Sequence, residues 1–580
     1  IGDSVLSGGG TVQVASLTAL GTGSITINAA TLQATTSLSY SGKNFFLGNV
    51  ASALTVASGD TFTLTNSGST SVSGSGKLNA NVAGILVLDD LLNPNTFAGG
   101  SSLFGGGTVK INSTTSLGDQ TTGAAALKDI TLQATADINT SRNFTLGSAA
   151  ARIAVDSTKT FTLSGNIVDG AQAGVLTKTG NGVLELSGTG NTFSGGTTVT
   201  AGTLRVSNAS GSATGTGAVT VSGSSTTLSG AGMIAGTATI ASGSILSPGG
   251  TGTAGTLTLG GLTLVSGSSL SYQLGANTAA SDRTVITGSS LFTANGGAIT
   301  LTGLSGLTSA TYNLITYSGT LGGSFNNLSL ASNYVTGGGN TFYAALVNNT
   351  GSVDLTTTNS LTWNGNISGT IWDAGVTANT NMKSGATTNL SFFDTMAVSF
   401  GDTSTGYTVN IPSNVAPSSV DVSAANDYLF QGAGTISGST GINKSGGGAL
   451  VINMANSFTG NVVLTAGSIE MKDPAALGKV WLDNAAREME KHIACRGTFN
   501  NPLWDHKYTD MLEGPIGSVR RVFDRFGFEW NETTEQSVAR HTRENQQHKF
   551  GHHRYHISDF QLTDFDVNLR FKSYLEEFQL

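Results

Sequence analysis

The amino-acid sequence predicts a mainly β protein: a right-handed parallel β-helix (β-solenoid) with an intervening antiparallel β unit and a small α-helical C-terminal segment. Three observations favour this fold class. Glycine supplies 80 of the 580 residues, apolar residues alternate with Thr, Ser and Asn over short stretches, and these stretches recur along the chain. Because an alternating strand is apolar on one face only, it must bury that face against neighbours, and stacked coils provide them.

The clearest repeat unit spans residues 174–206. Its landmarks are a Gly-rich turn, an alternating strand, Asn-x-Phe-x-Gly, a second strand and Ala-Gly. They return in the same order at 441–469, and more loosely at 86–111. The stretch TLQATTSLSYSGKNFFLG, which starts at Thr31, is also echoed by TLQATADINTSRNFTLG, which starts at Thr131. The repeats therefore predict an array of similar coils.

Changes in composition and in the repeat pattern divide the chain into four predicted domains. Residues 1–262 form a β-helix repeat array, with 243–261 as its terminal coil, and 263–358 form a β-rich closing unit in which Tyr becomes frequent. Residues 359–473 form a second β-helix repeat block, and 474–580 form an α-helical segment. Five aromatic residues are predicted to cap or start the second block: Trp363, Trp372, Phe392, Phe393 and Phe400.

The chain changes character at residue 474. All seven histidines and the one cysteine follow this point, and helical periodicity replaces alternation. Helices are predicted over 475–495, 516–526, 532–545 and 563–578. We expect Cys495, at the end of the first, to be a partly buried thiol without a catalytic role, since no base partner is indicated.

The composition and net charge of the chain exclude several classes of protein. The glycines show no three-residue period, which excludes collagen. A net charge of -8 with no basic stripe in the Gly-rich part argues against a nucleic-acid partner. A single cysteine excludes an internal disulfide framework, and no apolar run is long enough for a transmembrane helix. Because the sequence begins inside a repeat, we expect it to be a fragment.

Three stretches carry a resemblance to a known family. They are GNTFSGGTTVTAGTLRV, SILSPGGTGTAGTLTL and the block LTWNGN…IWD…FGD…GYTVNIP. In their order, over residues 1–473, they resemble the autotransporter-associated β-strand repeat proteins, which are bacterial surface or secreted passengers. The resemblance implies a parallel β-helix located extracellularly or at the outer-membrane surface. It also implies a structural or adhesive role, with a host surface, a neighbouring cell or a polysaccharide as partner. The membrane barrel or sorting anchor of that family does not follow the array.

Residues 505–580 resemble a different family, the C-terminal part of nucleotide-dependent bacterial sulfotransferases. The resemblance is carried by YTDMLEGPIGSVRRVFDRFGFEW and HKFGHHRYHISDFQL, although Gly514 stands where that family has Asp. The matching residues are Tyr508, Asp510, Leu512, Pro515, Lys549, Gly551, His553, Arg554 and Tyr555. By this resemblance, Lys549 and Arg554 would contact the 3′-phosphate of 3′-phosphoadenosine 5′-phosphosulfate.

No catalytic residue, cofactor or metal site is predicted. That family's N-terminal phosphate-binding loop has no counterpart here, because the Ser75-Gly76-Lys77-Leu78 stretch lacks the required upstream glycine and the Ser or Thr after Lys. Asp89 and Asp90 are adjacent on a predicted strand and so point to opposite faces, which keeps them from acting as paired carboxylates. The tail histidines have no spacing that sets ligands on one face; they are His548, His552, His553 and His556.

Four interpretations remain open at this point. The first is a structural or adhesive passenger with no catalytic activity of its own. The second is a sulfotransferase-related protein whose tail retains nucleotide contacts. In the third, the tail plugs the open end of the solenoid and suppresses strand addition. In the fourth, the join at 473/474 is an artefactual fusion of two genes.

Overall fold

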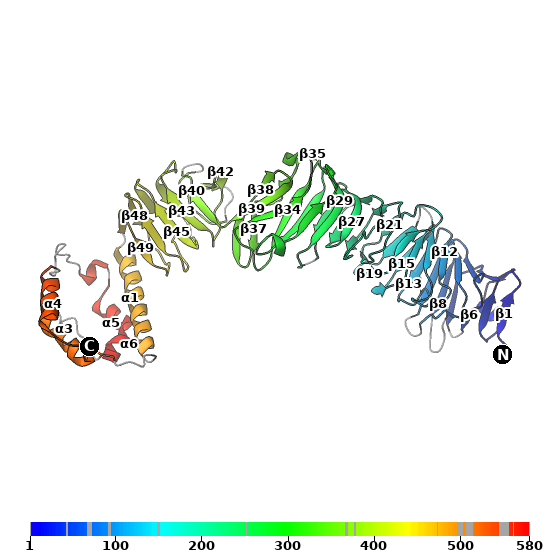
Figure 1. The fold of residues 1–580 in the computed structure, drawn as a ribbon, viewed down its shortest axis with the longest axis horizontal. Coiled ribbons are helices and arrows are strands. Elements are labelled where there is room, and N and C mark those ends of the chain that lie inside the picture. The colour runs from blue at the N-terminus through cyan, green and yellow to red at the C-terminus, as the bar shows by residue number, and fades with distance from the viewer. Residues whose placement is uncertain are drawn as a thin grey trace. The chain divides into compact units, whose positions relative to one another are not determined.

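The computed structural model describes residues 2–41, 44–65, 72–90, 94–147, 151–250, 252–365, 369–375, 379–471, 474–496, 498, 503–505, 514–544, 556–560 and 562–578. The chain folds as two compact units, Ile1–Asn359 and Ser360–Leu580. Stacked strands build unit 1 and the first part of unit 2, and helices follow near the C-terminus (Figure 1). The mainly β, parallel solenoid predicted from the sequence is confirmed. The domain boundaries placed at 262/263 and 473/474 stay predictions.

Unit 1 is built from parallel sheets, each of which collects one strand from successive coils. The first sheet contains β1 (Ser4–Ser7), β3 (Ile25–Asn28), β6 (Phe45–Leu47) and β9 (Val72–Ser73). The second contains β2 (Thr11–Val14), β4 (Thr31–Ala34), β7 (Ala53–Val56), β10 (Leu78–Val82), β12 (Ser101–Phe104), β14 (Ala125–Lys128), β17 (Phe144–Leu146) and β20 (Ile167–Asp169).

Two longer parallel runs complete this unit. One runs through β5 (Leu38–Ser41), β8 (Thr61–Thr65), β11 (Ile85–Asp89), β13 (Thr108–Ile111), β15 (Ile130–Ala134), β18 (Ala151–Val155), β21 (Leu176–Thr179), β23 (Thr197–Val199), β25 (Val219–Val221), β27 (Met233–Ile240), β29 (Thr256–Leu264), β31 (Arg283–Ile286), β32 (Phe292–Ala294), β34 (Thr311–Thr316) and β35 (Leu321–Gly323). The other runs through β16 (Ile138–Thr140), β19 (Thr160–Leu163), β22 (Val183–Leu186), β24 (Thr203–Val206), β26 (Thr227–Gly230), β28 (Ile245–Pro248), β30 (Ser269–Leu274), β33 (Ala298–Gly303) and β36 (Ser329–Leu330). Short 3₁₀ turns lie at η1 (Leu17–Leu20), η2 (Thr278–Ala280) and η3 (Phe325–Asn327).

In-register pairing stacks equivalent side chains into rows inside the solenoid. In one row, each residue is the Cα partner of the next and none is more than 2% exposed: Leu32, Leu54, Ala80, Leu103, Leu127 and Leu146. Full burial of a Leu side chain stabilises by about 1.5–3 kcal/mol. The alternating apolar residues of unit 1 therefore form one continuous core.

Antiparallel strand pairs occupy only part of residues 263–358, the segment predicted to form the antiparallel unit. Parallel coils continue through residues 243–261, which were predicted to be a terminal coil, and on to β36. Antiparallel pairs join β34 to β39 (Ser352–Thr358), β39 to β38 (Asn340–Asn349) and β38 to β37 (Tyr334–Gly337). Alternation sets the faces of a strand but not its direction, which here follows from the tight turn at Gly351, whose φ is 84°.

Unit 2 repeats the parallel arrangement on a smaller scale. One sheet contains, in order, β42 (Thr387–Leu390), β41 (Met382–Ser384), β40 (Ser360–Trp363), β43 (Ala397–Gly401), β45 (Ser419–Ser423), β47 (Ile442–Ser445) and β49 (Val462–Leu464). The other contains β44 (Thr408–Asn410), β46 (Tyr428–Gln431), β48 (Ala449–Asn453) and β50 (Ser468–Met471). All pairs are parallel except β40 with β41 and β41 with β42.

Aromatic side chains fill the first coils of this unit. Trp363, Trp372, Phe392 and Phe400 are each at most 1% exposed, whereas Phe393 is half-buried. The Trp372 ring lies 5.4 Å from Phe392 and 5.4 Å from Phe400, measured between ring centroids. Such tilted and edge contacts are the favoured geometries for aromatic pairs. Four of the five aromatic residues singled out in the sequence therefore belong to this core.

The helices of the tail lie close to their predicted ranges. They are α1 (Pro474–Arg496), α3 (Pro515–Phe526), α4 (Glu532–Glu544), α5 (Asp564–Arg570) and α6 (Lys572–Phe578), with a 3₁₀ turn η4 (Ile557–Phe560). The single helix predicted over 563–578 is two helices that meet at Phe571. Thr563 caps α5 in a reciprocal capping box with Asp566, and Arg570 donates to Asp483 on α1 at 2.8 Å. Cys495 is exposed, so the expectation of a partly buried thiol was wrong.

Buried cations hold corners of the coils. The side chain of Lys178 takes an inward position between Ile153 and Val199 and is 0% exposed. Its Nζ donates to the carbonyl oxygens of Thr179 at 2.7 Å, Gly180 at 2.7 Å and Ala201 at 3.1 Å. Burial lowers the pKa of Lys178 to about 8.

Two other buried cations also donate hydrogen bonds to backbone carbonyl groups. Lys444, 1% exposed, donates to the carbonyl oxygens of Ser445 at 2.7 Å and Gly446 at 2.9 Å. Arg142, also 1% exposed, donates to three loop carbonyls, among them that of Asp119 at 2.7 Å. In each case the buried cation obtains its hydrogen bonds from carbonyl groups at or next to a corner of a coil.

The Gly249-Gly250 segment directly after β28 depends on a close approach between Gly249 and Asp282. Gly249 has a φ of 73°, and a Cβ at this position would lie 2.4 Å from Asp282 Oδ1. The Asp282 carboxylate is buried and accepts hydrogen bonds from the backbone N–H groups of Gly255 and Gln273. Burial raises the pKa of Asp282 to about 6. The glycine is therefore required by both its backbone angle and its neighbour.

We predict that Gly249→Ala lowers the free energy of unfolding by about 2 kcal/mol, because it adds left-handed strain and a clash. Gly250→Ala is the matched control, since nothing lies within 4 Å of its Cβ position, and its effect should stay within about 0.5 kcal/mol. Urea unfolding followed by far-ultraviolet circular dichroism measures both. Equal stabilities for the two variants would contradict the close-approach argument.

A second prediction concerns pH. Since the folded-state pKa of Lys178, about 8, lies below its ordinary value of 10.5, the folded state binds fewer protons between these values, and stability rises with pH in this window. From about pH 8 to 9.5 the gain should approach about 2 kcal/mol in unit 1. The variant Lys178→Met should lose this dependence.

Two optical signals make the pH measurement specific. Circular dichroism follows the strands of both units, whereas Trp fluorescence reports unit 2 alone, because all five Trp residues lie after position 359. An unchanged pH slope in Lys178→Met would show that other groups cause it.

Candidate functional site

The outward faces of the coils carry rows of polar side chains at fixed spacing. Gln13 Nε2 donates to Gln33 Oε1 on the next coil at 3.1 Å, and in unit 2 Asn443 Nδ2 donates to Asp421 Oδ1 at 2.8 Å. Ser207 Oγ similarly donates to Glu185 Oε1 at 2.6 Å. Because neighbouring coils lie about 4.8 Å apart, these rows offer a repeating set of donors and acceptors. Such a surface suits contact over an area.

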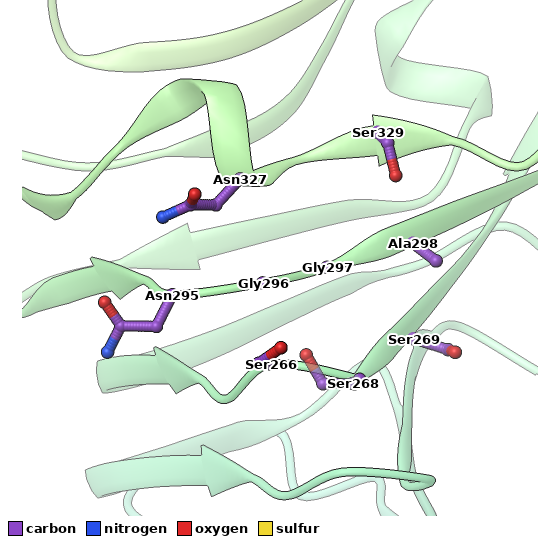
Figure 2. A pocket seen from close by; sticks show the side chains of 10 residues that line it. Ser266, Ser268, Ser269, Asn295, Gly296, Gly297, Ala298, Asn327 and Ser329 are labelled. Carbon is purple, nitrogen blue, oxygen red and sulfur yellow. The ribbon is translucent and has the colours of Figure 1, made fainter.

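A polar pocket lies where loops of three successive coils meet in unit 1 (Figure 2). Its volume is about 310 Å³. It is lined by residues 266–269, which lead from β29 into β30, by residues 295–298, which lead from β32 into β33, and by Asn327 and Ser329. Figure 2 shows Asn295 and Asn327 on neighbouring loops at one side of the pocket, with Ser329 at the other. Parallel stacking therefore brings together residues that are about sixty positions apart.

The chemistry of this pocket is neutral. Its side chains are hydroxyls and amides, and none of the lining residues is ionisable. Asn327 Nδ2 donates to the carbonyl oxygen of Ala294 at 2.9 Å, which leaves its Oδ1 as an acceptor. Ser268 Oγ is shielded from solvent and has no hydrogen-bond partner within the described residues. The pocket can hydrogen-bond water or a hydroxyl-bearing ligand through Ser266, Asn295, Asn327 and Ser329, but it offers no acid, base or nucleophile.

The adjacent carboxylates Asp89 and Asp90 serve the fold. Asp90 is 3% exposed and accepts hydrogen bonds from the hydroxyls of Ser113 at 2.6 Å, Thr115 at 2.8 Å and Ser116 at 2.8 Å. Asp89 accepts from Asn112 Nδ2 on the other side of the strand. The two carboxyl groups thus bind separate partners on the following coil, as their opposite directions along the strand require.

Lys549 and Arg554, the nucleotide contacts predicted from the sulfotransferase resemblance, lie outside the described residues. The tail histidines His548, His552 and His553 also lie outside them. His556 is described and exposed. In the described part of the tail, cations instead form ion pairs, as Arg496 does with Asp505. Nucleotide contact by Lys549 and Arg554 stays a prediction.

Two searches cover only the described residues. In that part of the chain, no group of three or more His, Cys, Asp or Glu side chains is placed to hold a metal ion. No described helix is both long and apolar enough to cross a membrane.

Sequence reasoning missed the buried lysines and the loop pocket. Lys178 and Lys444 occupy the same position in the two copies of the clearest repeat, in LTKTG and INKSG. A charged residue in the inward phase of an alternating strand was the signal that could have found them. The pocket has no such local signal, because three separate loops form it.

Comparisons with known proteins match the repeats. The Passenger-associated-transport-repeat family matches residues 176–206 and 442–471, which hold β21 to β24 and β47 to β50. The chain is also 34% identical over 121 residues to the adhesin BmaC autotransporter of Brucella suis biovar 1 (strain 1330). That alignment covers 21% of this chain and 3% of the relative's length. In these repeats, the chain is similar to the passengers of bacterial autotransporters.

Proposed function

We propose that this chain is part of a bacterial autotransporter passenger that acts as a structural or adhesive surface protein and has no catalytic activity of its own. The observation that carries the proposal is the position of the two passenger-repeat matches. Both lie on stacked coils of a parallel solenoid, so the matched sequence and the fold agree. The adhesin named above adds support.

The surface chemistry fits adhesion better than catalysis. Outward rows of Ser, Thr, Asn and Gln present many weak hydrogen-bonding groups, and the neutral pocket adds a concave point of contact. Repetition of weak contacts along the coils of one unit raises avidity without a single strong site. The partner we propose is a host surface, a neighbouring cell or a polysaccharide. The location we propose is extracellular or at the outer-membrane surface.

This proposal predicts saturable binding of the purified, fluorescently labelled chain to cultured epithelial cells. Unlabelled chain should compete, because both would occupy the same surface sites. The measurement is bound fluorescence as a function of chain concentration. Labelled albumin and heat-unfolded chain are the controls, and binding no greater than theirs would contradict the adhesive role. Competition by dextran would point to a polysaccharide partner.

The alternative, nucleotide contact by the tail, has a direct test. Titration of the full chain with 3′-phosphoadenosine 5′-phosphosulfate should give no saturable heat if the chain is only a passenger. If the tail binds the nucleotide, heat should appear and should be lost in Lys549→Ala and Arg554→Ala, because these two residues would lose their charge toward the 3′-phosphate. Heat that persists in both variants would assign the binding to other residues.

A further inference from the structure

The last coil of unit 2 is open on one side. Its strand β49 consists of Val462, Val463 and Leu464, which are 38%, 43% and 51% exposed. The order of strands in its sheet ends at β49, and the order in the neighbouring sheet ends at β50. Exposed apolar residues on an edge strand invite the addition of another strand.

In the first copy of the repeat, the residues equivalent to β49 are covered by the next coil. Aligned on Asn-x-Phe-x-Gly, Val462 corresponds to Thr197 and Leu464 to Val199. Thr197 and Val199 are 2% and 0% exposed, because β25 of the next coil pairs with β23. The same repeat unit is therefore buried at one place in the chain and uncovered at the other.

The backbone hydrogen bonds differ between the two copies in the same way. Thr197 N–H donates to the carbonyl oxygen of Ala218 on the next coil at 2.9 Å, and Val199 accepts from Ser222 N–H at 2.9 Å. In unit 2, the pairing of β49 with β47 uses the groups of alternate residues: Ile442 N–H donates to Asn461, and Thr465 N–H donates to Lys444. The N–H and C=O groups of Val462 and Leu464 face the open side, without a partner in the described residues.

The described helices of the tail do not cover this edge. Arg487 on α1 donates to the carbonyl oxygen of Thr459 at 3.3 Å, ahead of β49. The exposure of Val462, Val463 and Leu464 is that of the structure with α1 in place. One interpretation of the sequence was that the tail plugs the open end of the solenoid. The described residues of the tail do not cover β49 in this way.

We infer that the open edge of β49 binds a second copy of this chain, strand against strand around a two-fold axis. Coil addition is the contact that builds the rest of the solenoid, so a protein of the same repeat type is the partner whose backbone and apolar rows fit. With the axis at Val463, the two β49 strands run antiparallel. Val462 of one copy then exchanges both backbone hydrogen bonds with Leu464 of the second copy, which satisfies all the outward groups.

This geometry sets the two Val463 side chains directly opposite each other. Like charges in directly opposite positions are destabilising, and opposite charges are stabilising. Val463→Lys and Val463→Glu should therefore each raise the dissociation constant of the dimer several-fold. An equimolar mixture of the two variants should restore dimers, because Lys then faces Glu. This inference does not depend on the adhesive role.

Sedimentation velocity of the full chain over a range of concentrations tests the inference. The wild type should form dimers, the two variants should shift toward monomer, and their mixture should recover the dimer. Thr198→Lys is the matched control, since Thr198 holds the position of Val463 on the covered coil of unit 1, and it should associate as the wild type does. Circular dichroism checks that each variant is folded, which the exposure of Val463 favours.

Three outcomes would overturn the inference. One is a wild-type chain that stays monomeric at all concentrations. Another is a mixture of Lys and Glu variants that fails to associate. The third is growth into assemblies larger than dimers, which would replace the closed two-fold pair by head-to-tail addition of coils.

Discussion

Hydrogen bonding between parallel strands of successive coils is the interaction on which the rest of this structure depends. Each coil is too small to bury its own apolar face, so a strand such as β22 is stable only between β19 and β24. In-register pairing then places Leu above Leu in the interior and polar residues in rows outside. Core, surface and the open ends of the array all follow from this one contact.

Backbone hydrogen bonds are hardest to satisfy at the corners of the coils. At a corner the chain leaves the ladder, and carbonyl groups there need hydrogen-bond donors other than a neighbouring strand. The protein meets this need with buried cations, and Arg142, Lys178 and Lys444 each donate to loop carbonyls. The cost is desolvation of a charge, seen in the lowered pKa of Lys178. Three charge-assisted hydrogen bonds offset it.

The same geometry limits what kind of function the solenoid can carry. Outward side chains are held in rows at a fixed spacing, and the pocket near Asn295 and Asn327 is neutral and polar. No perturbed acid and base converge there, so contact by many weak hydrogen bonds is what the surface supports. The matched passenger repeats agree with this physical description. Where a coil lacks its neighbour, as at β49, the edge itself becomes a surface for association.

The sequence by itself determined the fold class, the inward and outward faces and the approximate helices of the tail. Period-two alternation and Asn-x-Phe-x-Gly landmarks are local, so they can be seen without coordinates. Only the tertiary structure decided that parallel stacking runs through residues 243–261 to β36, because alternation does not encode strand direction. Likewise, only the structure revealed the pocket and the open edge at Val462 and Leu464. Each of these depends on which coil lies beside which, and that is a contact between residues distant in sequence.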